Sequence, residues 1–156
     1  HFQVAMQSMF DSNIIPLLNQ KISIEKTPVL GICLGLQLMT QYSAEGDCKG
    51  LGWIEATVER IVPEDTKTFK VPHIGWRTLI NNPNCSILKN IDYATKPFYF
   101  CHKFAITHAI DGKCATYKYN KEYVGIYEKE NIFGVQFHPE KSQAHGQEMI
   151  SNFLNF

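Results

Sequence analysis

The chain has 156 residues, a length typical of one domain, and 44% of them are hydrophobic while 19% are charged. This composition excludes a disordered tail, and 15 basic against 15 acidic residues give no net charge to attract nucleic acid or anionic lipid. No apolar run approaches the roughly 20 residues of a membrane span, so we expect neither nucleic-acid nor membrane partners. The five cysteines form no CxxC pair, which favours reduced thiols and hence a cytoplasmic domain over a zinc or disulfide site.

Apolar spacing predicts helices at both ends of the chain and strands between them. The first helix is expected over residues 2–18, with Pro16 disturbing its last turn, and the last over 143–155. A short buried strand over 28–33 precedes a helix over 36–42. Further strands are predicted over 53–62, 69–76, 98–102, 115–119, 123–127 and 132–137. This order predicts one layered α/β domain over residues 1–156 with an antiparallel insertion.

A cysteine stands between the first predicted strand and the helix after it. The run Gly31-Ile32-Cys33-Leu34-Gly35 has the form of a nucleophile elbow, where small flanking residues permit a sharp, strained turn. A thiol at a helix N-terminus is expected to favour the thiolate, which attacks acyl carbons. The Leu34 N–H is placed to bind the oxyanion, and Gln37, one turn on, to contact a substrate. For this pentapeptide alone, a buried structural cysteine is an equal alternative, and for the other four cysteines a structural role is favoured.

A histidine and a glutamate follow the last predicted strand. Pro139 keeps His138 out of the α region, and in an extended segment residues 138 and 140 point to the same side. Glu140 can then orient His138 as a base at the carboxyl edge of a central strand. Alone, the pair is typical of a surface histidine and a solvated glutamate, but with Cys33 it indicates a Cys–His–Glu triad. His145 adds no known metal-ligand spacing, so no metal or other cofactor is expected.

Two motifs together resemble the class I glutamine amidotransferases. They are GICLGLQ at residues 31–37 and QFHPEKS at 136–142, in the order and separation of that family. GLGW at 50–53, KVPHIGW at 70–76 and FYFCH at 98–102 resemble the branch that forms the glutaminase subunit of imidazole glycerol phosphate synthase. The resemblance covers essentially the whole chain. It implies a flavodoxin-like three-layer α/β fold and hydrolysis of glutamine to glutamate and ammonia.

The same resemblance implies a role for each matching residue. Cys33 would form a γ-glutamyl thioester, with His138 and Glu140 completing the triad. The ammonia would pass to a partner, a (β/α)8-barrel cyclase, in histidine biosynthesis. The implied glutamine-binding residues are Leu34, Gln37, Lys103 and Phe104. The implied partner-interface residues are Pro72, His73, Gly75, Trp76 and Lys141.

The chain departs from the family pattern in three places. Family members are usually longer at the front, which implies an N-terminally truncated domain without the second oxyanion donor, and little or no glutaminase activity from these residues alone. Lys103 stands where the family more often has Ser, and Arg77 where it usually has Asn. The alternatives are a paralogous glutaminase that feeds a sugar amidotransferase, a non-catalytic truncated homologue, and a cysteine peptidase.

Overall fold

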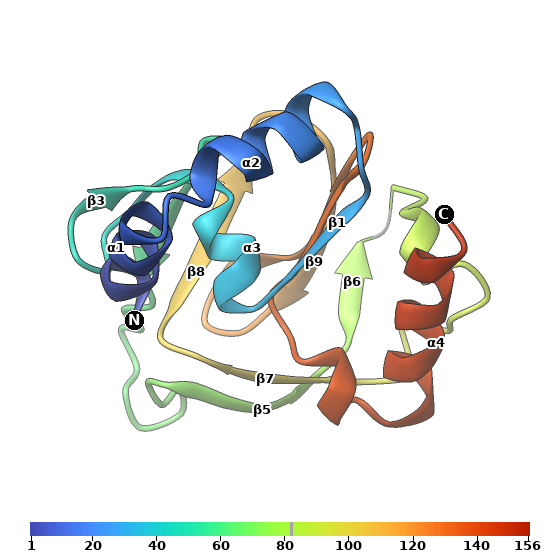
Figure 1. Cartoon of the computed structure of the whole chain (residues 1–156). Coiled ribbons are helices and arrows are strands. Elements are labelled where there is room, and N and C mark those ends of the chain that lie inside the picture. The colour runs from blue at the N-terminus through green and yellow to red at the C-terminus, as the bar shows by residue number, and fades with distance from the viewer. Residues whose placement is uncertain (82) are drawn as a thin grey trace.

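The computed structural model describes residues 1–81 and 83–156, which form a mixed α/β structure (Figure 1). Its α-helices are α1 (Phe2–Asp11), α2 (Ile15–Asn19), α3 (Leu34–Leu38) and α4 (Gln143–Leu154). A π-helical turn spans Gln20–Ile24, and 3-10 turns span Ser86–Leu88 and Pro139–Lys141. The strands are β1 (Val29–Ile32), β2 (Thr40–Ser43), β3 (Cys48–Lys49), β4 (Ile54–Arg60), β5 (His73–Arg77), β6 (Leu79–Asn81), β7 (Phe98–His102), β8 (Phe104–Ala109), β9 (Lys113–Lys118), β10 (Glu122–Lys129) and β11 (Ile132–Val135).

Three sheets organise these strands. The largest has the order β1-β11-β10-β9-β6, the second has the order β3-β2-β4-β8, and β5 pairs with β7. In the largest sheet β1 and β11 are parallel, and the last pair of their register is Ile32 with Val135. The chain therefore leaves both strands at the same edge, which places the segments after Ile32 and after Val135 side by side.

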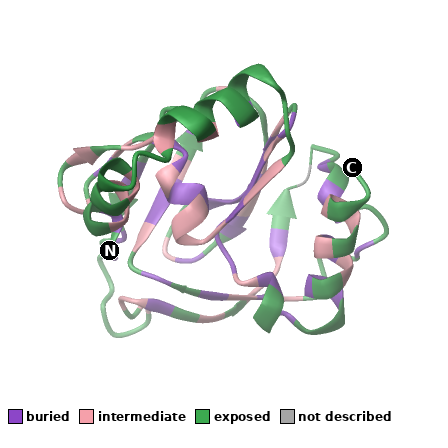
Figure 2. Cartoon of the chain, in the orientation of Figure 1, coloured by how far each residue is buried: buried purple, intermediate pink, exposed green. Residues whose placement is uncertain are grey.

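The largest sheet is covered on both faces. On one face Phe133 and Val135 pack in a buried cluster that includes Met149 of α4. On the other face Tyr127 packs with Leu36 of α3 and with strands of the four-stranded sheet. Figure 2 shows the buried positions following the strands between the exposed outer faces of the helices. These layers confirm the predicted layered α/β class.

Several predicted elements are confirmed, and others differ for identifiable reasons. The strands β1, β4, β7, β9, β10 and β11 and the helix α4 lie where the sequence predicts them. The single helix expected over 2–18 is wrong, because Asn13 adopts a φ of 53° and separates α1 from α2. Pro16 lies in the first turn of α2, where its missing N–H has no partner to lose. None of the helices in the described residues has the length and apolar character that a bilayer crossing requires.

The helix expected over 36–42 is also wrong in its extent. It begins at Leu34 and ends at Leu38, and Thr40–Ser43 form β2 instead. Thr40 hydrogen-bonds through its hydroxyl to the Gln37 carbonyl, 2.8 Å away, at the point where the helix ends. The short helix places Cys33 and Gln37 within one helical turn of each other.

Candidate active site

Cys33 occupies a strained turn between β1 and α3. Its backbone has φ 50° and ψ −100°, and its N–H donates to the Val135 carbonyl at 2.7 Å. A Cβ on Gly31 would lie 2.6 Å from backbone atoms of Gly35 and Leu36, so the close approach of strand and helix requires glycine there. A strained cysteine between a strand and a helix is the local geometry that the elbow motif predicts.

The thiol of Cys33 is protonated at neutral pH. Burial, the largest cause, together with Cys101 and Glu140 raises its pKa to about 11, although a hydrogen bond from the Leu34 backbone acts to lower it. The Leu34 N–H at the start of α3 thus favours the thiolate as expected, but the expected net preference for the thiolate is wrong. The physical reason is that desolvation of the buried sulfur outweighs this hydrogen bond. A nucleophilic reaction at this sulfur needs a base.

His138 and Glu140 form a hydrogen-bonded pair at the same edge of the sheet. Nδ1 of His138 lies 2.8 Å from Oε1 of Glu140, which leaves Nε2 to act on other groups. The backbone N–H of His138 donates to the Tyr99 carbonyl at 2.8 Å, which ties the histidine to β7. The predicted contact is present, but for a different reason: Glu140 lies in the 3-10 turn Pro139–Lys141 and not in an extended segment.

A cavity of about 420 Å³ opens beside the Cys33 sulfur. It is lined by His1, Cys33, Leu34, Gln37, Glu45, Pro72, Cys101, His102, Lys103 and Phe104. The structure thus brings together Cys33 and all four residues predicted to bind glutamine. Its walls carry one carboxylate, from Glu45, and one ammonium group, from Lys103, which suit a small zwitterionic ligand.

Sequence reasoning missed four residues of this cavity, namely His1, Glu45, Cys101 and His102. Glu45 follows β2 outside any motif, and no pattern in the sequence signals its place there. Cys101 lies in the FYFCH segment and alternates with the buried Phe100 and His102, so its outward direction follows from strand periodicity. His138 and Glu140 do not line this cavity, but Glu140 raises the pKa of Cys33 from nearby.

Two of the predicted interface residues lie in one exposed row. Trp76 of β5 packs edge-on against Tyr99 of β7, with ring centroids 5.5 Å apart. On the 3-10 turn, Lys141 places its Nζ 5.7 Å from the Tyr99 ring centroid. The row Trp76–Tyr99–Lys141 adjoins His138, whose N–H binds the Tyr99 carbonyl. Gly75, beside Trp76, has a φ of +148°, a conformation that side chains rarely adopt.

Burial contradicts the predicted interface role of His73, whereas that of Pro72 stays a prediction. His73 is 1% exposed and stacks on Tyr119 with centroids 4.0 Å apart, so its side chain cannot contact a partner. Pro72 faces the cavity beside Cys33. Arg77 donates to the Trp76 carbonyl at 2.8 Å and lies over the Tyr119 ring, so its guanidinium makes its contacts within this chain.

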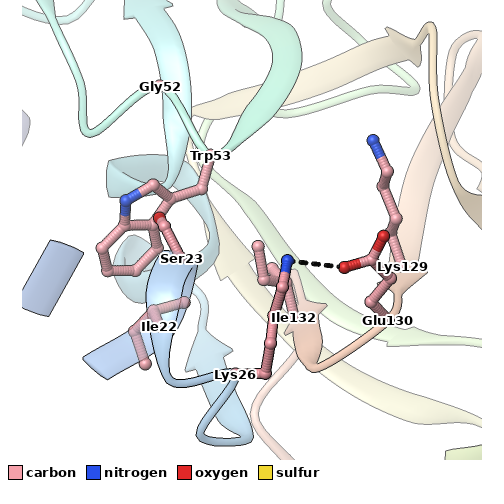
Figure 3. A pocket seen from close by; sticks show the side chains of 8 residues that line it. All are labelled: Ile22, Ser23, Lys26, Gly52, Trp53, Lys129, Glu130 and Ile132. Atoms are coloured by element: carbon pink, nitrogen blue, oxygen red, sulfur yellow. Dashed lines mark hydrogen bonds and ion pairs between the residues drawn. The ribbon is translucent and has the colours of Figure 1, made fainter. Parts of the chain in front are cut away.

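A second cavity, of about 260 Å³, lies near the opposite ends of β1 and β11 (Figure 3). Its charged groups are already paired, Lys26 with Glu130 at 2.8 Å and Lys129 with Asp111 outside the cavity. Neither a cysteine nor a histidine is among the residues that line it. Within residues 1–81 and 83–156, no group of three His, Cys, Asp or Glu side chains is placed to hold a metal ion.

Comparisons with known proteins identify relatives of the chain. Residues 11–155 match the family model described as glutamine amidotransferase class-I. The "Imidazole glycerol phosphate synthase subunit HisH 2" of Vibrio vulnificus is 40% identical over 99% of this chain and 72% of that protein. A protein of the same name from Methanococcus maripaludis is 37% identical over 98% of this chain and 75% of its own length.

Solved structures show the same fold. One described as "Crystal structure of glutamine amidotransferase" has a TM-score of 0.65 at 13% identity and covers 94% of this chain and 69% of that chain. A Thermoplasma acidophilum protein, described as belonging to a GMP synthase, has a TM-score of 0.56 at 17% identity, covering 90% of this chain and 62% of that chain. At these identities the likeness concerns the arrangement of elements.

Proposed function

The chain belongs to the class I glutamine amidotransferases, which makes it a glutamine-hydrolysing enzyme, and we propose that Cys33, His138 and Glu140 are its catalytic triad. Its HisH relatives further identify it as a glutaminase subunit of imidazole glycerol phosphate synthase, in histidine biosynthesis. The observation that best supports the triad is the 2.8 Å contact between His138 and Glu140. This pair lies at the sheet edge where Cys33 begins its strained turn. The parallel pairing of Ile32 with Val135 supports this convergence.

The proposed reaction follows from the resting state of these groups. Because the Cys33 thiol is protonated, Nε2 of His138 takes its proton as the sulfur attacks the amide carbon of glutamine. The C–N bond breaks, the imidazolium returns the proton to the leaving ammonia, and water then cleaves the thioester to glutamate. Glu140 holds the Nδ1 proton and stabilises the imidazolium. The Leu34 N–H binds the oxyanion.

Glutamine binding is assigned to the cavity beside the sulfur. In this proposal the Glu45 carboxylate binds the α-ammonium group, and the Lys103 ammonium group binds the α-carboxylate. Gln37 and Phe104 line the same cavity as these charges and Cys33. Lys103 thus supplies a charge where the family more often has a serine hydroxyl.

The proposed partner is a (β/α)8-barrel cyclase that receives the ammonia. The subunit names of the relatives imply a partner, and exposed aromatic side chains are typical anchors of interfaces. The row Trp76–Tyr99–Lys141, together with Gly75 and the 58% exposed Ile74, is the proposed docking face. Because this face adjoins His138, ammonia can pass to the partner without becoming ammonium in bulk water.

A glutamine-analogue electrophile tests the proposed function. The chain is treated with a diazoketone analogue of glutamine, and the modified thiol is identified by peptide mass spectrometry. We expect modification at Cys33 before the more exposed Cys101, protection by excess glutamine, and none at position 33 in Cys33→Ala. Equal modification of Cys33 and Cys101 without protection would contradict catalysis and favour a non-catalytic homologue. Cleavage of an added peptide that excess glutamine does not slow would favour a peptidase.

A further inference from the structure

The Cys33 sulfur has a side-chain hydrogen-bond donor to which the triad assigns no role. Nε2 of Gln136 lies 3.6 Å from Cys33 Sγ, within the range of hydrogen bonds to sulfur, although the two residues are 103 positions apart. Gln136 directly follows β11 and is 0% exposed. Its backbone N–H donates to the Gly125 carbonyl at 2.9 Å. The amide is therefore fixed by the fold, inside the protein and against the reacting atom.

The neighbouring hydrogen bonds determine which end of this amide faces the sulfur. Gln37 is 2.9 Å from the Phe104 carbonyl and 3.0 Å from Oε1 of Gln136. A backbone carbonyl only accepts hydrogen bonds, so the Gln37 atom that faces Phe104 is the amide nitrogen. The second N–H of that nitrogen requires an acceptor, which is the Gln136 oxygen. The NH2 group of Gln136 is thus turned towards Cys33.

A buried histidine pair fixes the Phe104 carbonyl in turn. Nδ1 of His102 donates to this carbonyl at 2.8 Å, so its Nε2 must accept. Two donors stand there, the Tyr117 hydroxyl at 3.1 Å and His73 Nδ1 at 3.3 Å. Burial lowers the pKa of His102 to about 4 and that of His73 to about 3, so both rings are neutral at neutral pH. When Nδ1 of His73 donates, its Nε2 carries a lone pair, and this atom, which has no partner, is the end of the hydrogen-bond chain.

We propose that Gln136 is a further catalytic residue, whose amide N–H donates to the Cys33 sulfur and stabilises the thiolate that attacks glutamine. Gln37 and His102 act as positioning residues, because they hold the Gln136 amide in the donating orientation. The N–H···S bond becomes charge-assisted only when the sulfur loses its proton, so it stabilises the reacting form more than the resting form. This inference rests on the proposed function of Cys33.

The substitution Gln136→Glu tests the donor directly. A glutamate has nearly the same shape and still accepts from Gln37, but its ionised form has no N–H for the sulfur. We expect the pH midpoint of Cys33 alkylation by iodoacetamide to rise by about one unit, which is about a tenfold slower reaction below the midpoint. The matched control is Gln41→Glu, the same change at an exposed position of β2, which should leave the midpoint unchanged.

The other titratable groups around the sulfur are the same in every variant. Cys101 and Glu140 act on it electrostatically, His138 is its proposed base, and His1, Glu45, His102 and Lys103 share its cavity. Gln136→Met removes the donor without adding a charge, so it should shift the midpoint in the same direction by less. Cys85, which is 4% exposed, reports folding because it should stay unmodified in each native variant.

If both Gln136→Glu and Gln136→Met unfold, a measurement on the unsubstituted chain tests whether Gln136 donates to Cys33. The side-chain amide protons of Gln136 should shift in NMR spectra as Cys33 ionises, and should not shift in Cys33→Ala. The inference would be overturned by an unchanged alkylation midpoint in the folded variants. It would also be overturned if the Gln136 amide protons kept their chemical shifts while Cys33 ionises. The proposed function would survive that result if the glutamine analogue still modified Cys33 with protection by glutamine.

Discussion

Cys33 combines a strained backbone with a thiol that resists ionisation. Its φ of 50° holds the side chain at the turn, and burial raises its pKa to about 11. A protonated thiol is a weak nucleophile and is less easily oxidised than a thiolate. The site therefore depends on neighbouring groups for reactivity, and the proposed groups are His138 as the base and Gln136 as the donor to the developing charge.

Trp76 is the residue on which the proposed docking face depends most. It is 39% exposed and supported by Tyr99, and aromatic side chains in such settings often dominate binding energy. We expect Trp76→Ala to weaken binding to the barrel by about 2 kcal/mol, roughly thirtyfold in Kd, as measured by titration calorimetry. Phe10→Ala, at an exposed aromatic position on α1, is the matched control. Unchanged affinity in Trp76→Ala would place the partner elsewhere.

The local geometry of short motifs could be predicted, whereas most of the side-chain contacts between distant segments could not. The Cys33 turn and the His138–Glu140 contact are local, so their spacing in the sequence was sufficient. The bond from Gln136 to the sulfur depends on the pairing of β1 with β11, which no motif encodes. The predicted interface position of His73 was wrong because its side chain is buried in β5 against Tyr119, a contact between distant segments of the chain.

At the scale of elements, the close packing of α3 against the largest sheet positions the nucleophile. A Cβ on Gly134 of β11 would lie 2.3 Å from a methyl carbon of Leu36, and one on Gly31 would collide with the backbone of α3. Backbone cannot move aside as a side chain can. Glycine in β1 therefore sets the distance between strand and helix, and with it the height of the Cys33 thiol above the sheet.

The two glycines of the elbow should differ in their tolerance of a methyl group. Gly31→Ala places its Cβ 2.6 Å from backbone atoms, and we expect it to lower the free energy of unfolding by about 1–3 kcal/mol. Gly35→Ala meets nothing within 4 Å and lies within α3, so it should be neutral or stabilise by about 0.4–1 kcal/mol. Urea unfolding measures both changes. Equal effects of the two substitutions would contradict the packing described here.

The elements that could be predicted are those with a clear apolar period. The amphipathic α4 and the alternating β7 lie where the sequence places them. The pairs and triplets that form β3 and β6 are too short to produce a pattern, and β8 does not alternate strictly in burial. In the segment after Leu38, the hydrophobic pattern suggested a longer helix, but pairing with β3 and β4 determines a strand.

At the scale of the whole molecule, the layered fold brings distant parts of the chain to one sheet edge. The parallel pair β1–β11 delivers Cys33 and His138, and β7 contributes Tyr99 behind the histidine. The turn after β7 closes the cavity, and the outer side of β5 and β7 carries the proposed docking face. The proposed chemistry and the proposed partner contact thus share the same strands, so a partner that moves β7 should also move His138.

The central claim is that His138 activates the Cys33 thiol, and the pH–rate profile of Cys33 modification by the glutamine analogue tests it most directly. The unsubstituted chain should react at neutral pH. His138→Gln should react roughly 10²–10⁴-fold more slowly there and recover only as the pH approaches the thiol's own pKa of about 11. The rate at which Cys101 is modified, followed in the same peptide mass spectra, should be equal in the two chains. Superimposable profiles for Cys33 in the two chains would contradict the account.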